Sequence, residues 1–112
     1  MDLTQEKIGD VAVVTVAAEY LDANNAREFK QQIADLIAGS PKLVLDLGNV
    51  LFMDSSGLGA LLTCLRQLSG SGGDMKVCGV TKPVRALFEL VRMNRILETY
   101  PSREDALKAF KG

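Results

Sequence analysis

The sequence predicts an α/β fold built on a mostly parallel sheet. Apolar runs typical of buried strands alternate with helical apolar periodicities from residue 11 onward, and glycine or proline separates several of these segments. Such alternation favours parallel strands joined by right-handed crossovers, whereas we expect the first strand to join at an edge. At 112 residues the chain has the length of one domain, so we expect residues 1–112 to form a single one.

The N-terminal part predicts a hairpin and then a helix. Residues 11 to 18, VAVVTVAA, form a β-branched apolar run, and the turn-like Gly9-Asp10 separates them from LTQEKI, which can supply a partner strand. The linker EYLDANN leads into a helix, whose apolar residues share one face: Phe29, Ile33, Leu36 and Ile37. Asn25 and Glu28 resemble a capping box at the start of that helix.

The central part predicts a buried strand, a second helix and another strand. In LVLDL, residues 43 to 47, the apolar residues do not alternate with polar ones, as expected of a strand buried on both faces. The following helix carries leucines at helical spacing: Leu58, Leu61, Leu62, Leu65 and Leu68. GSGG, residues 70 to 73, ends this helix, and MKVCGV predicts the next strand.

The C-terminal part predicts a third helix, a short strand and a fourth helix. Pro83 suits a first helical turn, and apolar residues on one face accompany it: Val84, Leu87, Phe88 and Val91. A short strand is expected around Ile96 to Thr99. Ser102 as N-cap, with Asp105 at the third position, marks the start of the last helix.

The composition argues against several classes of function. With 13 basic and 14 acidic side chains the net charge is only -1, so no overall field would recruit nucleic acid or an anionic membrane. The longest uncharged apolar run is far shorter than the ~20 residues of a membrane span. The N-terminus, MDLTQEKIGD, does not look like an export signal. We therefore expect a cytoplasmic globular protein with no membrane or nucleic-acid partner.

Catalysis is not expected. The chain has no histidine, which excludes a Ser-His-Asp triad and removes the usual ligand of catalytic zinc. Gly57 and Gly59 lack the third glycine of a dinucleotide fingerprint, and no GK[ST] follows for a P-loop. The two cysteines, Cys64 and Cys78, lie in apolar patterns and are expected to be core thiols. We predict neither an enzyme nor a cofactor or metal site.

The segment 50–62, VLFMDSSGLGALL, is the candidate functional site. It follows a strand and starts a helix, which places Asp54, Ser55 and Ser56 at the carboxyl edge of a mainly parallel sheet, where ligands and partners tend to meet such sheets. Either Asp54 or Ser55 could be the N-cap of the helix. One cap suffices for that task, so at least one hydroxyl is left without a structural explanation.

Two explanations account for the glycines of this segment, and the sequence does not favour one over the other. Gly57 and Gly59 each cost up to ~1 kcal/mol relative to alanine inside a helix. Either they fit closely against the domain's own sheet, or a partner approaches the backbone there. The preceding residues Leu51, Phe52 and Met53 are expected to pack the segment onto the core. Exposure of Met53 as an apolar contact for a partner is the alternative.

Phosphorylation of Ser55 would add a charge of about -1.5 to -2 near a helix N-terminus, where the dipole and free N–H groups favour an anion. The fold should therefore survive the modification. A protein partner pressed against this surface would meet a dianion beside Asp54, at a cost on the order of several kcal/mol in repulsion and desolvation. About 1.4 kcal/mol is tenfold in affinity, so this cost can end a micromolar contact.

At these residues the sequence resembles the anti-sigma-factor antagonist family, the free-standing STAS domains of bacteria. FMDSSGLGALL matches that family's regulatory segment nearly residue for residue. VVTVAAEYLDANNAREFKQQI resembles its strand, Leu-Asp loop and first helix, and GGDMKVCGVTKPVRALFELVRMNRIL resembles its fourth strand and third helix. The resemblance spans nearly the whole chain and implies a STAS-like domain of about five strands with four helices. Glu19 stands where members commonly have glycine, two residues before Leu-Asp.

The resemblance also implies a partner switch. Ser55 matches the serine that an anti-sigma factor with kinase activity phosphorylates. The unmodified antagonist would bind that kinase and free a sigma factor, phosphorylation would end the binding, and a metal-dependent serine phosphatase would reset it. On the same grounds we assign further residues to the partner surface: Asp22, Asn24, Met53, Asp54, Ser56, Gly57 and Gly59.

Two other functions stay open from the sequence. Related STAS domains occur in transporters and sensory assemblies, and a helix N-terminus can hold an anion, so a small-molecule or nucleotide sensor is one. A scaffold that binds partners without any switch is the other.

Overall fold

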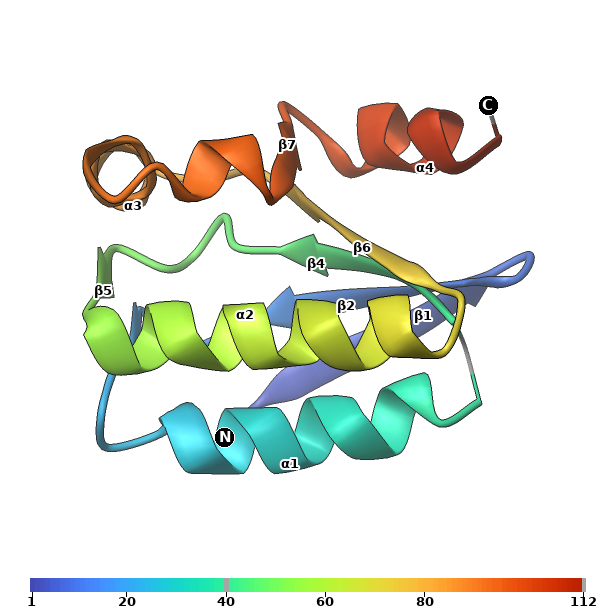
Figure 1. Ribbon diagram of the computed structural model, residues 1–112, viewed down its shortest axis with the longest axis horizontal. Coiled ribbons are helices and arrows are strands. Elements are labelled where there is room, and N and C mark those ends of the chain that lie inside the picture. The colour runs from blue at the N-terminus through green and yellow to red at the C-terminus, as the bar shows by residue number, and fades with distance from the viewer. Residues whose placement is uncertain (40, 112) are drawn as a thin grey trace.

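The computed structural model describes residues 1–39 and 41–111, and a five-stranded sheet lies at its centre. The strands follow the order β1 (Leu3–Ile8), β2 (Val11–Val16), β4 (Lys42–Asp46), β6 (Asp74–Cys78) and β7 (Glu98–Tyr100). β1 and β2 pair antiparallel, and the other neighbours pair parallel (Figure 1). The predicted α/β fold with a hairpin strand at one edge is confirmed.

The described residues form four α-helices: α1 (Ala26–Ile37), α2 (Ser55–Gly70), α3 (Lys82–Leu90) and α4 (Arg103–Lys111). α1 and α2 lie side by side on one face of the sheet, and α4 packs on the other face against β4, β6 and β7 (Figure 1). α3 and the short 3-10 helix η1 (Met93–Arg95) lie at the end where β4 and β6 finish. The start of α2 is at that same end.

Side chains of the central strands alternate between two apolar layers. Ala12 and Val14 of β2 belong to the larger core with α1 and α2, whereas Val11 and Val13 belong to a smaller core with Ala106 of α4. The middle of β4 is buried on both faces, as predicted. Full burial of each Val or Leu side chain contributes about 1.5 to 3 kcal/mol, so both layers stabilise the sheet.

Three strands differ from the prediction. β3 (Tyr20–Leu21) and β5 (Phe52–Met53) form a small parallel ladder of their own within segments that were expected to be loops. A strand of two residues has no periodicity that a sequence pattern can reveal. β7 begins at Glu98, later than the expected strand around Ile96 to Thr99, because the N–H of Ile96 still closes η1 by donating to the carbonyl of Met93 at 3.1 Å.

One predicted cap is wrong and another is confirmed. Asn25 precedes α1, but its side chain accepts the N–H of Asp22 at 2.9 Å and donates to the carbonyl of Tyr20 at 2.9 Å, so it braces the loop and does not cap the helix. At α4, the N–H of Asp105 donates to Ser102 Oγ at 3.2 Å, and that hydroxyl donates to Asp105 Oδ2 at 3.1 Å. Ser102 therefore caps α4 as expected.

The two cysteines are core thiols, as predicted. Cys64 and Cys78 are free and buried, one in each apolar layer. Burial raises the pKa of each thiol to about 11. Neither is therefore a candidate nucleophile or metal ligand, because both functions need the thiolate.

Candidate functional site

The segment before α2 and the loop before α1 are paired. In the β3–β5 ladder, Leu21 lies opposite Met53. The N–H groups of Leu51 and Phe52 both donate to the carbonyl of Glu19, at 2.6 and 3.2 Å. This pairing holds the loop before α1 against the first turn of α2, although the two segments are far apart in the sequence.

Asp54 is the N-cap of α2. Its Oδ1 accepts the N–H groups of Ser56 and Gly57 at 2.9 and 3.1 Å, and its Oδ2 accepts the N–H of Ala23 at 3.3 Å. The carboxylate therefore caps the helix and also holds the neighbouring loop. A cap of this kind stabilises a helix by about 0.5 to 2 kcal/mol. Of the two residues that the sequence offered as the cap, the structure selects Asp54.

Ser55 and Ser56 are left free by this cap. They are the first two residues of α2, and both side chains are exposed. Within residues 1–39 and 41–111, neither hydroxyl has a hydrogen-bond partner. Both hydroxyls are accessible at the positive end of the helix dipole, where an added anion is tolerated.

The two glycines of this segment have different explanations. A Cβ at Gly57 would lie 2.3 Å from the carbonyl oxygen of Leu21 and 2.7 Å from Cγ of Met53. Gly57 is therefore required by the close approach of the loop before α1. A Cβ at Gly59 would have nothing within 4 Å, and Gly59 is exposed. The domain's own packing explains Gly57 and leaves Gly59 accessible to a partner's backbone.

The apolar residues before Asp54 do not all pack as expected. Leu51 and Phe52 are 52% and 55% exposed, whereas Met53 is 5% exposed and belongs to the larger core. Successive residues of a strand point to opposite faces, so Phe52 faces solvent when Met53 faces the core. The prediction that all three pack inward is wrong for two of them. Met53, which was assigned to the partner surface, supports the site from below instead.

Asp22 and Asn24 lie on the loop that Asp54 holds. Asp22 Oδ1 accepts the N–H of Asn24 at 3.0 Å, and the carbonyl of Asp22 accepts the N–H of Ala26, the first residue of α1, at 2.8 Å. The side chain of Asn24 is exposed and that of Asp22 is partly exposed. Both residues are therefore brought to the same surface as Ser55. Their role in binding a partner stays a prediction.

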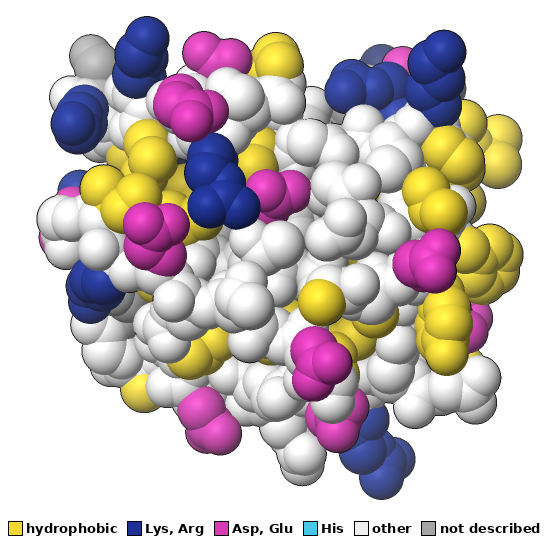
Figure 2. Space-filling model, turned by 180° about the vertical axis from the view of Figure 1, so that it is seen from behind, with side chains coloured by type: hydrophobic (Ala, Val, Ile, Leu, Met, Phe, Trp, Pro, Cys, Tyr) yellow, Lys and Arg dark blue, Asp and Glu magenta, His cyan; other side chains and the backbone are white. Residues whose placement is uncertain are grey.

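An exposed apolar surface beside Ser55 was missed by sequence analysis. Tyr20 and Phe52 lie opposite each other in the β3–β5 ladder, and their side chains are 50% and 55% exposed. α3 packs against β5 and adds Leu90, which is 80% exposed. Figure 2 shows hydrophobic side chains along this end of the molecule, at the right edge of the view. The only signal in the sequence is the apolar run before Asp54, whose orientation depends on the unpredicted strand β5.

The start of α2 is an exposed part of the surface. Cavities of about 470 and 430 Å³ lie elsewhere, between the C-terminal ends of α1 and α2 and between the β1–β2 turn and α4. No group of three or more His, Cys, Asp or Glu side chains among the described residues could hold a metal ion. No helix in residues 1–39 and 41–111 is long and apolar enough to cross a membrane. The exposed start of α2 therefore suits a macromolecular partner better than an enclosed small ligand.

Comparison with known proteins identifies the class to which this fold and site belong. A family model of the STAS domain matches residues 2–106, and the chain belongs to this family. Among its relatives, the anti-sigma F factor antagonist of Paenibacillus polymyxa is 31% identical over 109 residues, which are 96% of this chain and 92% of that protein. Anti-sigma factor antagonists are regulators and not enzymes, in agreement with the prediction from the sequence.

Solved structures show the same architecture. An anti-sigma factor antagonist from Mycobacterium paratuberculosis superposes with a TM-score of 0.88 at 28% identity, over 99% of this chain and 94% of that one. The Bacillus cell fate determinant SpoIIAA in its phosphorylated form superposes with a TM-score of 0.71 at 18% identity, over 96% of this chain and 99% of that one. The second likeness shows the fold alone.

Proposed function

We propose that this protein is a cytoplasmic anti-sigma factor antagonist controlled by phosphorylation of Ser55. The unmodified form binds an anti-sigma factor that is also a serine kinase, and this binding frees a sigma factor. Phosphorylation of Ser55 ends the binding, and a metal-dependent serine phosphatase restores it. The observation that carries the proposal is the exposed Ser55 hydroxyl, which has no structural task because Asp54 already caps α2.

The surroundings of Ser55 favour a switch that acts on the partner and not on the fold. A phosphate on the first residue of α2 would lie at the positive end of the helix dipole, so the helix would tolerate it. A chain of the same fold, SpoIIAA, has been solved in a phosphorylated form. A partner seated over Ser55 would have to bury the dianion beside the Asp54 carboxylate, at a cost on the order of several kcal/mol.

The first experiment identifies the partner and tests the release. Wild-type protein and the Ser55→Asp variant serve as parallel baits in lysate of the source bacterium, and mass spectrometry quantifies what each one retains. We expect an ATP-binding anti-sigma kinase on the wild-type bait and a loss of at least about tenfold on Ser55→Asp, because 1.4 kcal/mol of repulsion suffices for that factor. Equal retention of one partner by both baits would favour a scaffold without a switch.

The second experiment tests the modified residue. The purified kinase and ATP are incubated with wild type, Ser55→Ala and Ser56→Ala, and phosphate incorporation is measured by intact-mass spectrometry. Ser56→Ala is the matched control, because its hydroxyl is also exposed, one residue further along α2. We expect stoichiometric modification of wild type and Ser56→Ala and none of Ser55→Ala. Full modification of Ser55→Ala would show that the site assignment is wrong.

A further inference from the structure

An apolar surface extends from the Ser55 segment onto α3. We propose that this surface is the main source of affinity for the anti-sigma factor, whose matching face is apolar with carboxylates at its border. The inference rests on the proposed function, from which it takes the partner, and it adds where and by which chemistry the partner is held. The surface, called the end patch, consists of five exposed residues: Tyr20, Leu51, Phe52, Leu90 and Val91.

The exposure of these side chains needs an explanation beyond packing. Leu90 is 80% exposed. The other four side chains are at least half exposed: Tyr20 50%, Leu51 52%, Phe52 55% and Val91 50%. Apolar side chains gathered at one end of a small domain mark an interaction site more often than scattered ones do. Aromatic residues such as Tyr20 and Phe52 are enriched at the centres of protein interfaces. Burying one such side chain against a partner contributes about 1.5 to 3 kcal/mol, which raises the binding affinity about tenfold or more.

The exposed apolar side chains at the end of α3 lie on the side of the helix away from η1 and β7. Arg85 and Glu89 line a cavity shared with Asn94 and Thr99, which identifies the flank of α3 that faces η1 and β7. At about 100° per residue, Leu90 and Val91 fall on the other side of the helix axis from Arg85 and Glu89. α3 also packs against β5. The exposed apolar residues of these two neighbouring elements lie at the same end of the molecule, where Figure 2 shows hydrophobic side chains next to one another.

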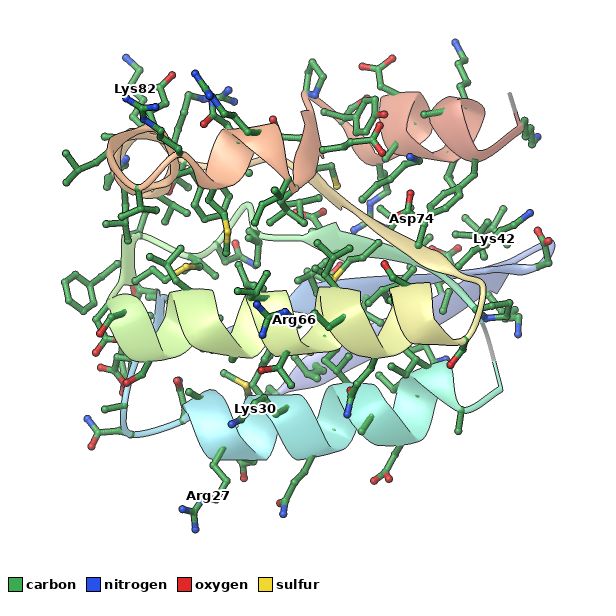
Figure 3. All side chains as sticks on the ribbon, viewed as in Figure 1. Arg27, Lys30, Lys42, Arg66, Asp74 and Lys82 are labelled. Atoms are coloured by element: carbon green, nitrogen blue, oxygen red, sulfur yellow. The ribbon has the colours of Figure 1, made fainter. Side chains whose placement is uncertain are left out.

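Unpaired cations border the α3 part of the end patch. Lys82 is the first residue of α3 and Arg92 follows its end, and both are exposed. Neither forms an ion pair with another described residue. Figure 3 shows Lys82 on α3 at the same end of the molecule as the start of α2, and Figure 2 shows Lys and Arg side chains next to the hydrophobic ones there. Partner carboxylates would complement both cations.

The opposite border of the end patch disfavours a lipid surface. Asp22 follows β3 and Asp54 follows β5, and the chain runs from β5 toward the start of α2, away from α3 (Figure 1). An anionic membrane over the patch would be repelled by both carboxylates. A protein with a mixed border can satisfy the two sides separately. Phe52 also stands three residues before Ser55, so a partner that covers Ser55 reaches the end patch without a second docking event.

The test separates docking from chemistry. Phe52→Ser and Leu90→Ser are prepared in the full chain, with Ile8→Ser as control, because Ile8 is an exposed apolar residue at the far end of the sheet. Affinity for the purified kinase is measured by calorimetry, and phosphorylation of Ser55 is followed to obtain kcat and KM. We expect each patch variant to bind about tenfold or more weakly, with KM raised in proportion and kcat within about twofold of wild type. Ile8→Ser should match wild type.

Charge reversal at Lys82 tests the cationic border of the end patch and the carboxylates proposed for the partner. Lys82→Glu should weaken kinase binding, and the difference from wild type should shrink as salt is raised, because exposed ion pairs are screened. Circular dichroism of each variant checks that the fold is intact, and all substituted side chains are exposed. Affinities of Phe52→Ser and Leu90→Ser that equal wild type, with normal phosphorylation of Ser55, would overturn this inference and leave the proposed function standing.

The end patch could instead bind a second copy of this chain or a membrane. Each of these would give a distinct experimental result, and either result would overturn the inference. A wild-type dimer in sedimentation that Leu90→Ser abolishes, with kinase affinity unchanged, would assign the end patch to a second copy of this chain. Binding of wild type but not Lys82→Glu to phosphatidylserine vesicles, again with kinase affinity unchanged, would assign it to a membrane. Failure of the kinase to modify wild-type Ser55 would instead contradict the proposed function.

Discussion

Gly57 lies where the loop before α1 crosses the first turn of α2, and no side chain fits between the two backbones. The carbonyl oxygen of Leu21 occupies the place that a Cβ would take, and the side chain of Met53 closes the space from below. Two residues further along the helix, Gly59 meets nothing. Identical residues of one motif thus serve different purposes, because only one of them faces a neighbouring segment.

Alanine substitutions should separate these purposes. Gly57→Ala should lower the free energy of unfolding by about 1 to 3 kcal/mol, because the Cβ forces the loop and the helix apart. Gly59→Ala should raise it by about 0.4 to 1 kcal/mol, because alanine is the better helix former and the space is open. Urea denaturation of the two variants beside wild type measures both values. Equal effects at the two positions would mean that the close approach to Leu21 is not maintained in solution.

The Asp54 carboxylate gives a second prediction at the scale of one residue. Asp54→Ala removes the acceptor for Ser56, Gly57 and Ala23, and should lower the free energy of unfolding by about 0.5 to 2 kcal/mol. Asp54→Asn retains a side-chain oxygen at the cap and should keep most of that stability. Urea denaturation is again the measurement. Indistinguishable losses for Ala and Asn would show that the hydrogen bonds to Asp54 are not what stabilises this turn.

At the scale of elements, a single lysine ties β6, β7 and α4 together. Lys76 Nζ binds Glu98 at 2.9 Å and Asp74 at 3.3 Å, and it lies 4.9 Å from the ring centroid of Phe110. Desolvation by burial lowers the pKa of Lys76, but the hydrogen bonds and charges of Glu98 and Asp74 outweigh it and raise the pKa. The buried ammonium group is therefore retained as a charge between strand and helix.

Acid should loosen this connection through Glu98. The hydrogen bond from Lys76, followed by that from Tyr100, holds the pKa of Glu98 below its ordinary value. A carboxylate whose folded pKa is lowered contributes stability that is present above the unfolded value of about 4.3 and is lost as pH falls through the folded value. We expect the urea midpoint of wild type to fall more than that of Glu98→Gln between about pH 5 and pH 3.

The control for this acid effect is Glu104→Gln, an exposed position of α4. It should keep the pH dependence of wild type. The effect at Glu98 is expected to be modest, because its side chain is 56% exposed and solvent screens the pair. The same fall in wild type and Glu98→Gln would mean that the ion pair with Lys76 adds nothing to the attachment of β7.

At the scale of the whole molecule, the sheet separates two apolar layers and places one thiol in each. Cys64 lies in the layer beneath α1 and α2, and Cys78 lies in the layer beneath α4. They are 0% and 1% exposed, and burial raises the pKa of each to about 11. The reactivity of the two thiols therefore reports on both layers at once.

A thiol reagent should detect cooperative unfolding of the two layers. In native protein near pH 8 we expect neither Cys64 nor Cys78 to react with Ellman's reagent, because both are protonated and inaccessible. In denaturant both should react, over the same urea range as the loss of helical circular dichroism. Cys78→Ser and Cys64→Ser variants assign each signal. Reaction of Cys78 well before the circular dichroism transition would show that α4 opens separately from the rest.

Long elements with regular patterns could be predicted from the sequence, and short ones that depend on distant partners could not. β2 and β4 were recognisable because buried strands carry continuous apolar runs, and the leucine spacing of α2 is that of a helix face. β3 and β5 each have two residues and exist only because they pair with each other. The exposure of Phe52 and the burial of Met53 both follow from that pairing. Inward packing was expected of both residues, so the prediction was right for Met53 and wrong for Phe52.

The sequence by itself determined the alternation of strands and helices, the absence of imidazole chemistry and the position of the Asp-Ser-Ser-Gly segment at a helix start. Only the tertiary structure decided that Asp54 is the cap, that Ser55 is free, that Gly57 is required and that apolar side chains surround the site. The physical reason is that these features depend on contacts between the loop before α1 and the start of α2. The hydrogen bond from Ala23 to Asp54 joins residues separated by 31 positions, and no local periodicity encodes such a meeting.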